Sequence, residues 1–316
     1  IFFMKLSYIY FLKFYTNNYN IKMKIILMGQ QKFGESTLKK FHEETNHKII
    51  AVYCVPDSDE KSIDPVKKYA QSYGIPVFQP LNFNEQKVID QIKSHDADLF
   101  IMAYVNIFLP EVIRNIPKHG TICFHPSLLP LHRGPSSINW PIIRGAKKTG
   151  LTIFYPNNSL DEGDIILQKE VEISLDDTLG DVYFSKIFPL GVNLCVEAAN
   201  LISDGNAPRI TQDESKATYE SWCKKSDARI NWNKSGREIY NLIRGCNPQP
   251  GAWSYFMGNE FIFFDTNFIN DKTIKNPPGQ IISINKDNIN IAVKEGVLKI
   301  SRFKSDQGKL YVKDMN

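Results

Sequence analysis

Short apolar runs alternate with amphipathic segments through the first part of the chain, from Met23 onward. Five runs predict buried strands, at residues 24–29, 48–56, 76–79, 97–104 and 120–127. Apolar residues at helical spacing predict helices between these runs, at residues 33–45, 63–73, 84–96 and 109–116. Repeated strand–helix–strand units form a parallel sheet with helices on both faces. The pattern therefore predicts an α/β fold with a Rossmann-like, mostly parallel sheet.

The pattern of apolar positions changes after Thr149. Two further strands are predicted at 151–156 and 164–173, on either side of the polar loop 157–163. A long helix is predicted at roughly 178–203, closed by the Asp204–Gly205 pair.

Short alternating runs of apolar and polar residues occupy the chain from residue 252 to its end. Such alternation is typical of a small all-β unit, and we expect a β-barrel of the OB type. The segment 206–228 is polar and has few apolar anchors, so we expect a linker there. The expected organisation is an α/β domain at 23–205, the linker, and a barrel domain at 229–316.

Residues 1–22 are aromatic and apolar, contain Lys5 and Lys13, and have no acidic residue. A membrane span needs about 20 clean apolar residues, and a mitochondrial presequence is rich in Arg as well as poor in acids. The segment fits neither description fully. We expect the fold to begin at Met23 and residues 1–22 to be an extra N-terminal segment; an organelle-targeting segment is the alternative.

Charge and cysteine content narrow the possible functions. The formal net charge is +4, without a block of like charges, so the composition requires neither a nucleic acid nor a membrane as partner. The five cysteines are scattered without C-x-x-C spacing, which is typical of reduced thiols and offers no metal site. We expect a cytoplasmic protein, with a mitochondrial location as the alternative.

The turn GQQKFG at 29–34 lacks the middle glycine of a dinucleotide motif, so nicotinamide binding by this domain is not expected.

Two polar loops carry the candidate chemistry. His125 ends an apolar strand and begins the loop HPSLLPLHRG, and Asp161 lies in the loop SLDEGD. Ligands of open parallel sheets bind beyond the carboxyl ends of the strands, where His125 is expected. A carboxylate beside an imidazole orients the ring and raises its basicity, and it can hold a water molecule. From these residues alone, an acid–base pair and a structural histidine that caps a loop are about equally compatible with the sequence.

The motifs HPSLLP-x-HRG and LD-x-GD, in this order, resemble those of the formyltransferase family. The segments RINW at 229–232 and NPQPGAW at 247–253 are similar to the C-terminal domain of that family. Within the family, the chain most resembles the N-terminal hydrolase domain of 10-formyltetrahydrofolate dehydrogenase. The resemblance implies that 10-formyltetrahydrofolate is the substrate, that tetrahydrofolate is a product, and that His125 and Asp161 are catalytic.

One position separates the branches of this family. Transferases carry Asn two residues before the catalytic His, whereas this chain has Cys123 there. A thiol is a poor substitute for an amide donor, so we expect hydrolysis rather than transfer to an amine. Methionyl-tRNA formyltransferase is the alternative. Leu131 is a second departure, because the family usually has Arg there, and it puts one anion contact in doubt. His132 and Arg133 are as compatible with loop packing as with substrate binding.

The segment 102–110 matches the pterin-binding loop of the family. The resemblance implies that Ile107, Phe108 and Leu109, together with Asp161, bind the folate; ordinary packing at a helix start is the alternative. The resemblance implies no metal. NADP is implied only through the carrier and aldehyde-dehydrogenase domains that follow in the longer dehydrogenases, and the sequence does not say whether such domains follow here.

Overall fold

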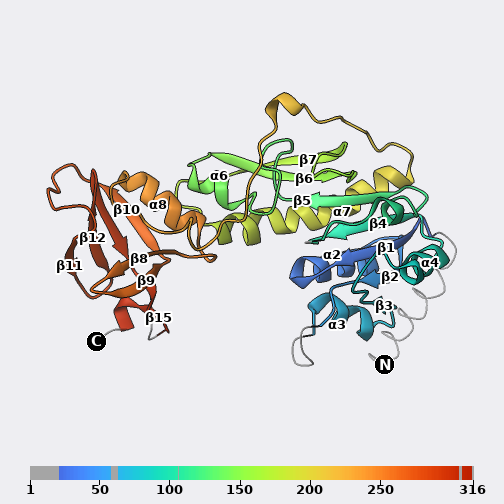
Figure 1. Ribbon diagram of the computed structural model, residues 1–316, viewed down its shortest axis with the longest axis horizontal. Helices are drawn as coiled ribbons and strands as arrows, with labels where there is room; N and C mark the ends of the chain where they lie inside the picture. Colours follow the sequence, from blue (N-terminus) through green and yellow to red (C-terminus); the bar gives the residue numbers. More distant parts are fainter. Residues whose placement is uncertain (1–20, 58–62, 106, 306–307, 315–316) are drawn as a thin grey trace, which may run out of the picture. The chain divides into compact units, whose positions relative to one another are not determined.

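The computed structural model describes residues 21–57, 63–105, 107–305 and 308–314 (Figure 1). The segment expected to precede the fold, except for residues 21 and 22, lies outside these residues. The chain divides into two compact units. Unit 1 runs to His125 and adds residues 152–168 and 189–212, whereas unit 2 comprises residues 126–151, 169–188 and the chain from Asp213 onward. The two units alternate along the sequence, so they divide the chain differently from the contiguous domains predicted above.

The described residues form one seven-stranded sheet with the order β3-β2-β1-β4-β5-β6-β7. Its strands are β1 (Lys24–Gly29), β2 (Lys48–Tyr53), β3 (Val77–Phe78), β4 (Leu99–Ala103), β5 (Thr121–His125), β6 (Lys148–Phe154) and β7 (Ile165–Glu172). The first five strands pair in parallel, and β6 pairs antiparallel with β5. The predicted α/β class with a mostly parallel sheet is confirmed.

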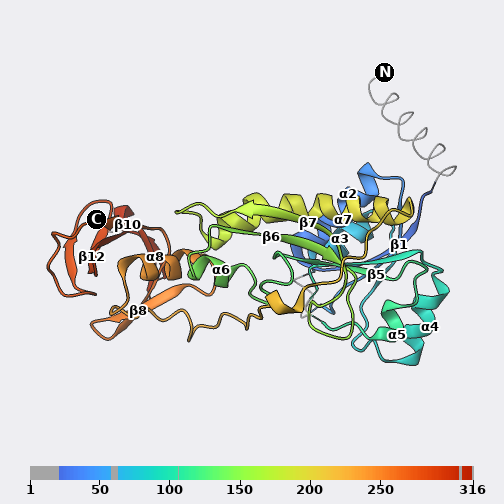
Figure 2. The same cartoon turned by 90° about the horizontal axis from the view of Figure 1, so that it is seen from above.

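Helices cover both faces of the sheet in unit 1 (Figure 2). They are α2 (Gln31–Glu44), α3 (Pro65–Ser72), α4 (Gln86–Ser94), α5 (Glu111–Arg114) and α7 (Phe188–Ser203). On one face, Phe33 of α2 stacks on Phe124 of β5 at 4.3 Å between ring centroids, and a Cβ at Gly191 of α7 would lie 2.5 Å from Phe124. The other face packs against α4 and α5 through a buried cluster that includes Phe100 and Ile113.

The glycines of the first turn serve packing between β1 and α2. A Cβ at Gly29 would lie 2.9 Å from the carbonyl oxygen of Ala103 and 3.1 Å from the Cα of Gly34. Only residues without side chains allow this approach of strand and helix. Glycine at both positions therefore allows β1 and α2 to pack closely.

Unit 2 contains two four-stranded antiparallel sheets, with the orders β10-β13-β12-β11 and β15-β14-β9-β8. The strands are β8 (Ala252–Phe256), β9 (Asn259–Phe263), β10 (Thr266–Asn270), β11 (Ile281–Ile284), β12 (Ile289–Val293), β13 (Gly296–Ile300), β14 (Arg302–Ser305) and β15 (Gly308–Tyr311). Its helical segments are α6 (Asn139–Ile143), η2 (Asp181–Ile187), η3 (Glu214–Lys216), α8 (Gly236–Gly245) and η4 (Val312–Asp314). An antiparallel, strand-rich C-terminal region thus follows the α/β fold, as predicted.

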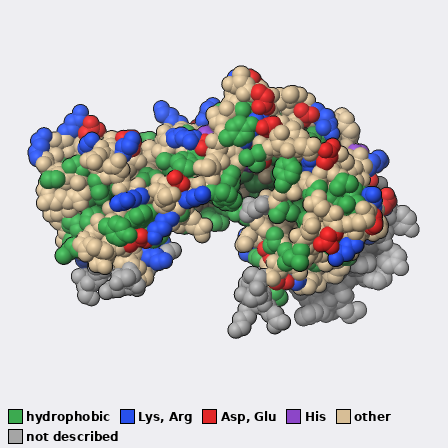
Figure 3. All heavy atoms as spheres, in the orientation of Figure 1, with side chains coloured by type: hydrophobic (Ala, Val, Ile, Leu, Met, Phe, Trp, Pro, Cys, Tyr) green, Lys and Arg blue, Asp and Glu red, His purple; other side chains and the backbone are tan. Residues whose placement is uncertain are grey.

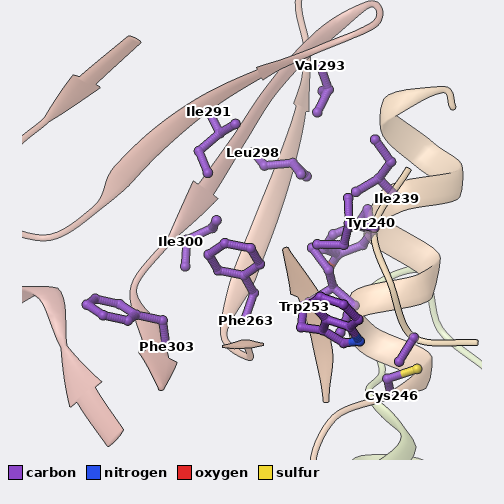
Figure 4. Packing of buried hydrophobic residues seen from close by; sticks show 14 of the residues in the cluster. Ile239, Tyr240, Cys246, Trp253, Phe263, Ile291, Val293, Leu298, Ile300 and Phe303 are labelled. Carbon is purple, nitrogen blue, oxygen red and sulfur yellow. The ribbon is translucent and has the colours of Figure 1, made fainter. Parts of the chain in front are cut away.

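A single buried cluster joins both antiparallel sheets to α8 (Figure 4). Ile239 and Tyr240 face it from the helix, and Leu298 and Phe303 face it from the two sheets. Helix α8 begins with a capping box, in which the Ser235 hydroxyl accepts from the Glu238 backbone and the Glu238 carboxylate accepts from the Ser235 backbone. The helix start is thus fixed by its own sequence.

The structure adds local detail to two of the expected segments. The helix predicted at 178–203 consists of a π-helical turn, η2, followed by α7. The segment predicted as a linker is held by backbone hydrogen bonds, between Ile165 and Ile210 in unit 1 and between Arg133 and Glu220 in unit 2. Among the described residues, no helix is both long and apolar enough to cross a membrane.

Candidate active site

His125 and Asp161 lie side by side in unit 1. The Nδ1 atom of His125 is 3.5 Å from an Oδ atom of Asp161, and both side chains are mostly buried, with 8% and 17% of their surface exposed. The structure therefore brings the predicted pair into direct contact. At this distance the carboxylate interacts electrostatically with the imidazole ring.

The route by which Asp161 reaches His125 differs from the expectation. His125 was expected at the carboxyl edge of a parallel sheet, and Asp161 on the neighbouring loop after the strand at 151–156. Strand β6 is instead antiparallel to β5, with Thr152 opposite His125 and Phe154 opposite Cys123. The loop after β6 therefore starts alongside the interior of β5 and must fold back to bring Asp161 to the strand end.

Gln212 holds the folded-back loop in place. Its side chain is 5% exposed, and its Nε2 donates hydrogen bonds of 2.8 Å to the backbone oxygens of Asp161 and Gly163. Asp161 has a φ of 57°, in the left-handed region that costs a non-glycine residue roughly 1 kcal/mol. The two hydrogen bonds from Gln212 thus stabilise a backbone conformation that the loop would not favour alone.

Gly163 explains the glycine of the LD-x-GD motif. A Cβ at this position would lie 1.6 Å from the backbone oxygen of Tyr155, so no side chain fits without a backbone shift. The close approach accompanies a hydrogen bond of 2.9 Å from the Tyr155 amide to the Asp164 carbonyl. The motif therefore builds a tight return of the chain immediately after Asp161.

Arg114 supports the other side of the same loop. Its guanidinium donates to the Pro156 carbonyl at 2.6 Å and to the Asn158 side-chain oxygen, and Asn158 donates to Glu111 at 2.7 Å. Arg114 is 5% exposed, and burial lowers the pKa of its guanidinium. Sequence reasoning missed both Arg114 and Gln212, because their partners are more than 40 residues away and no local motif marks them.

The Cys123 thiol lies next to the pair but is not activated. The residue is half-buried and packs against the cluster on the α4 and α5 face. Burial raises the pKa of the Cys123 thiol well above its ordinary value, and the negative charge of Asp161 raises it further. A thiol held in its protonated form is a weak donor and a poor nucleophile. These properties argue against covalent catalysis by Cys123.

The predicted folate-contacting residues divide into two kinds. Ile107 and Phe108 are 38% and 60% exposed, and the guanidinium of Arg114 lies 5.8 Å from the centre of the Phe108 ring. Leu109 is 2% exposed and belongs to the buried cluster, as the alternative of helix-start packing expects. The side chains of Ile107 and Phe108 are therefore available to a ligand, whereas Leu109 offers only main-chain groups.

In unit 2, the loop after His125 is held by contacts with two carboxylates. His132 lies 2.7 Å from Glu220 through Nδ1, and the fully buried Arg133 binds both carboxylate oxygens of Glu214. These contacts support the packing role of His132 and Arg133. Leu131, where the family usually has Arg, is 40% exposed. No three His, Cys, Asp or Glu residues in the described part of the chain are placed to hold a metal ion.

Comparison with known proteins identifies the class of this fold and site. The formyl transferase family model matches residues 22–197, and the model of the formyl transferase C-terminal domain matches residues 223–314. The chain belongs to the formyltransferase family, as the motifs indicated.

The relatives come from two branches of the family. The chain is 39% identical to cytosolic 10-formyltetrahydrofolate dehydrogenase of Xenopus tropicalis over 267 residues, which cover 83% of this chain but 29% of that protein. It is 35% identical to methionyl-tRNA formyltransferase of Alkaliphilus oremlandii over 298 residues, which cover 92% of this chain and 95% of that protein. The chain thus spans less than a third of the dehydrogenase and nearly all of the transferase.

Solved structures share the fold at low sequence identity. HypX from Aquifex aeolicus, in complex with tetrahydrofolic acid, is similar with a TM-score of 0.67 at 17% identity, covering 92% of this chain and 46% of that one. The sugar 3N-formyl transferase WlaRD is similar with a TM-score of 0.64 at 19% identity, and the match covers 92% of this chain and 99% of that one. At such identities these similarities show the fold alone.

Proposed function

We propose that this protein hydrolyses 10-formyltetrahydrofolate to tetrahydrofolate and formate, as the hydrolase domain of a 10-formyltetrahydrofolate dehydrogenase does, or passes the formyl group to a thiol. The observation that carries the proposal is the contact between His125 and Asp161 at the end of β5. Membership of the family and the folate named in the relatives supply the substrate class.

The proposed roles follow from the chemistry of acyl transfer. Asp161 holds a water molecule and accepts its proton as the water oxygen bonds to the formyl carbon. His125 stabilises the negative charge that develops on the formyl oxygen. The bond between the formyl carbon and N10 then breaks, N10 takes the proton that Asp161 accepted, and the formic acid that is formed releases its own proton to give formate. The exposed side chains of Ile107 and Phe108 flank the pterin ring.

Cys123 favours water or a thiol over an amine as formyl acceptor. In the transferases an Asn at this position supplies an amide donor, and the absent donor corresponds to roughly 2–4 kcal/mol of oxyanion stabilisation. The raised pKa of the Cys123 thiol keeps it protonated, so it provides only a weak hydrogen bond in place of the amide.

Methionyl-tRNA formyltransferase is the second candidate, and two observations favour it. The relative with that name is matched over nearly its whole length. Residues 223–314 contain 15 Lys and Arg against nine Asp and Glu, a net charge of +6, whereas the whole chain has +4. Lys and Arg side chains, coloured blue, recur in Figure 3 over the part that shows strands β8 to β15. A positive surface attracts nucleic acid.

One comparison separates the two candidates. The purified chain is given 10-formyltetrahydrofolate with and without charged initiator tRNA, and both formate and formylated tRNA are measured. We expect formate release to dominate, and Cys123→Asn to shift the balance toward tRNA. Cys123→Ala, which adds no donor, is the matched control and should leave the balance unchanged. Efficient formylation of tRNA by the unmodified protein would establish the second candidate instead.

A carrier domain, an aldehyde-dehydrogenase domain and the use of NADP are proposals that concern sequence beyond Asn316. They follow from the dehydrogenase relatives, of which this chain matches only a part. Sequencing the transcript past Asn316 tests them. We propose a cytoplasmic location, with the mitochondrion as alternative, and imaging of the tagged full-length protein distinguishes the two.

A further inference from the structure

Two cysteines far apart in the sequence meet in unit 2. The sulfur atoms of Cys223 and Cys246 are 4.0 Å apart, and both residues are free thiols. Cys246 is the C-cap of α8, and Figure 4 shows it within the buried cluster that also contains Trp253. A disulfide bond is about 2.05 Å long, so the sulfurs need to approach by roughly 2 Å to form one.

The backbone on both sides of the pair is anchored. The Cys223 amide donates to the Ser136 hydroxyl at 2.9 Å. The Cys246 amide donates to the Leu242 carbonyl at 3.0 Å, and the Cys246 carbonyl accepts from Gly251 at 2.9 Å. These hydrogen bonds keep the two sulfurs near one another without involving either thiol.

The two thiols differ in access to solvent. Cys246 is fully buried, whereas Cys223 is half-buried between the exposed residues Trp222 and Lys224. A reagent in solution therefore reaches Cys223 first. The positive charge of Lys224 attracts an anionic reagent.

The hydrogen bond between the thiols reinforces this difference. Either sulfur can donate this hydrogen bond. The hydrogen bond lowers the pKa of the Cys223 thiol. The same hydrogen bond and burial raise the pKa of Cys246. An accessible thiol with a lowered pKa is the nucleophile in thiol–disulfide exchange. Once Cys223 is in a mixed disulfide, the thiol–thiol hydrogen bond that is the largest cause of the raised Cys246 pKa is gone. Cys246 lies 4.0 Å from the Cys223 sulfur and is therefore placed to resolve the product.

We propose that Cys223 and Cys246 are a redox-active dithiol, which a low-molecular-weight disulfide such as oxidised glutathione converts to an intramolecular disulfide. The Cys223 thiolate attacks one sulfur of the reagent, forms a mixed disulfide and releases one glutathione thiolate. Cys246 then loses its proton and attacks the Cys223 sulfur, and the second glutathione leaves as a thiolate. Two electrons and two protons pass from the protein to the reagent, which is reduced to two thiols.

The disulfide would act on the segment that holds the loop after His125. Residues 213–228 contribute the carboxylates that bind His132 and Arg133, and Cys223 belongs to the same segment. A covalent bond to the end of α8 ties this segment to the core of unit 2. Both ends of the bond and the held loop lie in unit 2.

The test uses the full chain, first reduced and freed of reductant, then treated with oxidised glutathione. Intact mass and non-reducing peptide mapping identify the products. We expect the loss of two hydrogen atoms and a peptide that links Cys223 to Cys246. A protein that keeps all its thiols, or a disulfide that joins other cysteines, would overturn the proposal.

Serine variants separate the two steps. Cys246→Ser should stop at a stable mixed disulfide on Cys223, whereas Cys223→Ser should leave Cys246 unmodified. Cys54→Ser, which removes another buried thiol, is the matched control and should form the disulfide as the unmodified protein does. Rapid glutathionylation of Cys246 in the Cys223→Ser variant would show that the order of attack is wrong and would overturn the proposed mechanism.

Discussion

Gln212 offers a sharp test of how the candidate site is held together. We predict that Gln212→Leu slows formyl release although Gln212 carries no chemistry in the proposed mechanism. Leucine keeps roughly the volume of glutamine but donates no hydrogen bond. The backbone oxygens of Asp161 and Gly163 would then lose the donors that hold them at 2.8 Å.

The magnitude follows from those two hydrogen bonds. Each contributes about 1 kcal/mol net when the freed carbonyl partly recovers water, so the positioned loop loses about 2 kcal/mol. Because 1.36 kcal/mol corresponds to tenfold in rate, we expect a fall of about 30-fold in kcat/KM. Most of the fall should be in kcat, because Asp161 leaves its place beside His125 while Ile107 and Phe108 are untouched.

The assay is formate release from 10-formyltetrahydrofolate under steady-state conditions, with the melting temperature measured in parallel. Gln79→Leu is the matched control, because Gln79 also donates to a backbone oxygen, that of Val55 at 2.7 Å, but belongs to the edge of the sheet near β3. We expect this control to retain normal turnover. If Gln212→Leu turned over like the unmodified protein, the idea that Gln212 positions Asp161 would be refuted.

Three further predictions concern the site and the fold. His125→Ala and Asp161→Ala should each abolish formyl release, and the double variant should be little worse than either, because a pair that works together is not additive; near-normal turnover of either variant would refute the pairing. Gly163→Ala should lower both activity and melting temperature, by roughly 1–3 kcal/mol in the free energy of unfolding, because its Cβ meets the Tyr155 oxygen. Burial lowers the pKa of His47 from 6.5, so its contribution to stability should be complete above that value and should be lost as the pH falls below it. Urea unfolding at about pH 7.5 and about pH 5.5 measures how much the free energy of unfolding falls as the pH is lowered. This fall should be smaller for His47→Gln than for the unmodified protein, and equal falls would contradict this assignment.

The hydrophobic pattern was sufficient for the order of strands and helices in the first part of the chain. Strands such as β1 and β4 are buried on both faces and appear in the sequence as unbroken apolar runs. Local periodicity and turn residues carry this information, because burial of one element shows in its own sequence. The same reasoning placed His125 correctly at the end of β5.

Strand direction and long-range anchoring were decided by the tertiary structure. The runs that become β5 and β6 have the same apolar character whether they pair in parallel or antiparallel, so the sequence did not reveal how Asp161 returns to His125. Gln212 lies in a polar stretch that resembles a linker, and its role depends on a loop about 50 residues earlier. Likewise, Cys223 and Cys246 show no spacing typical of paired cysteines, yet their sulfurs lie 4.0 Å apart. Local periodicity indicates which positions are buried. Contacts between residues far apart in the sequence depend on the tertiary fold of the whole chain.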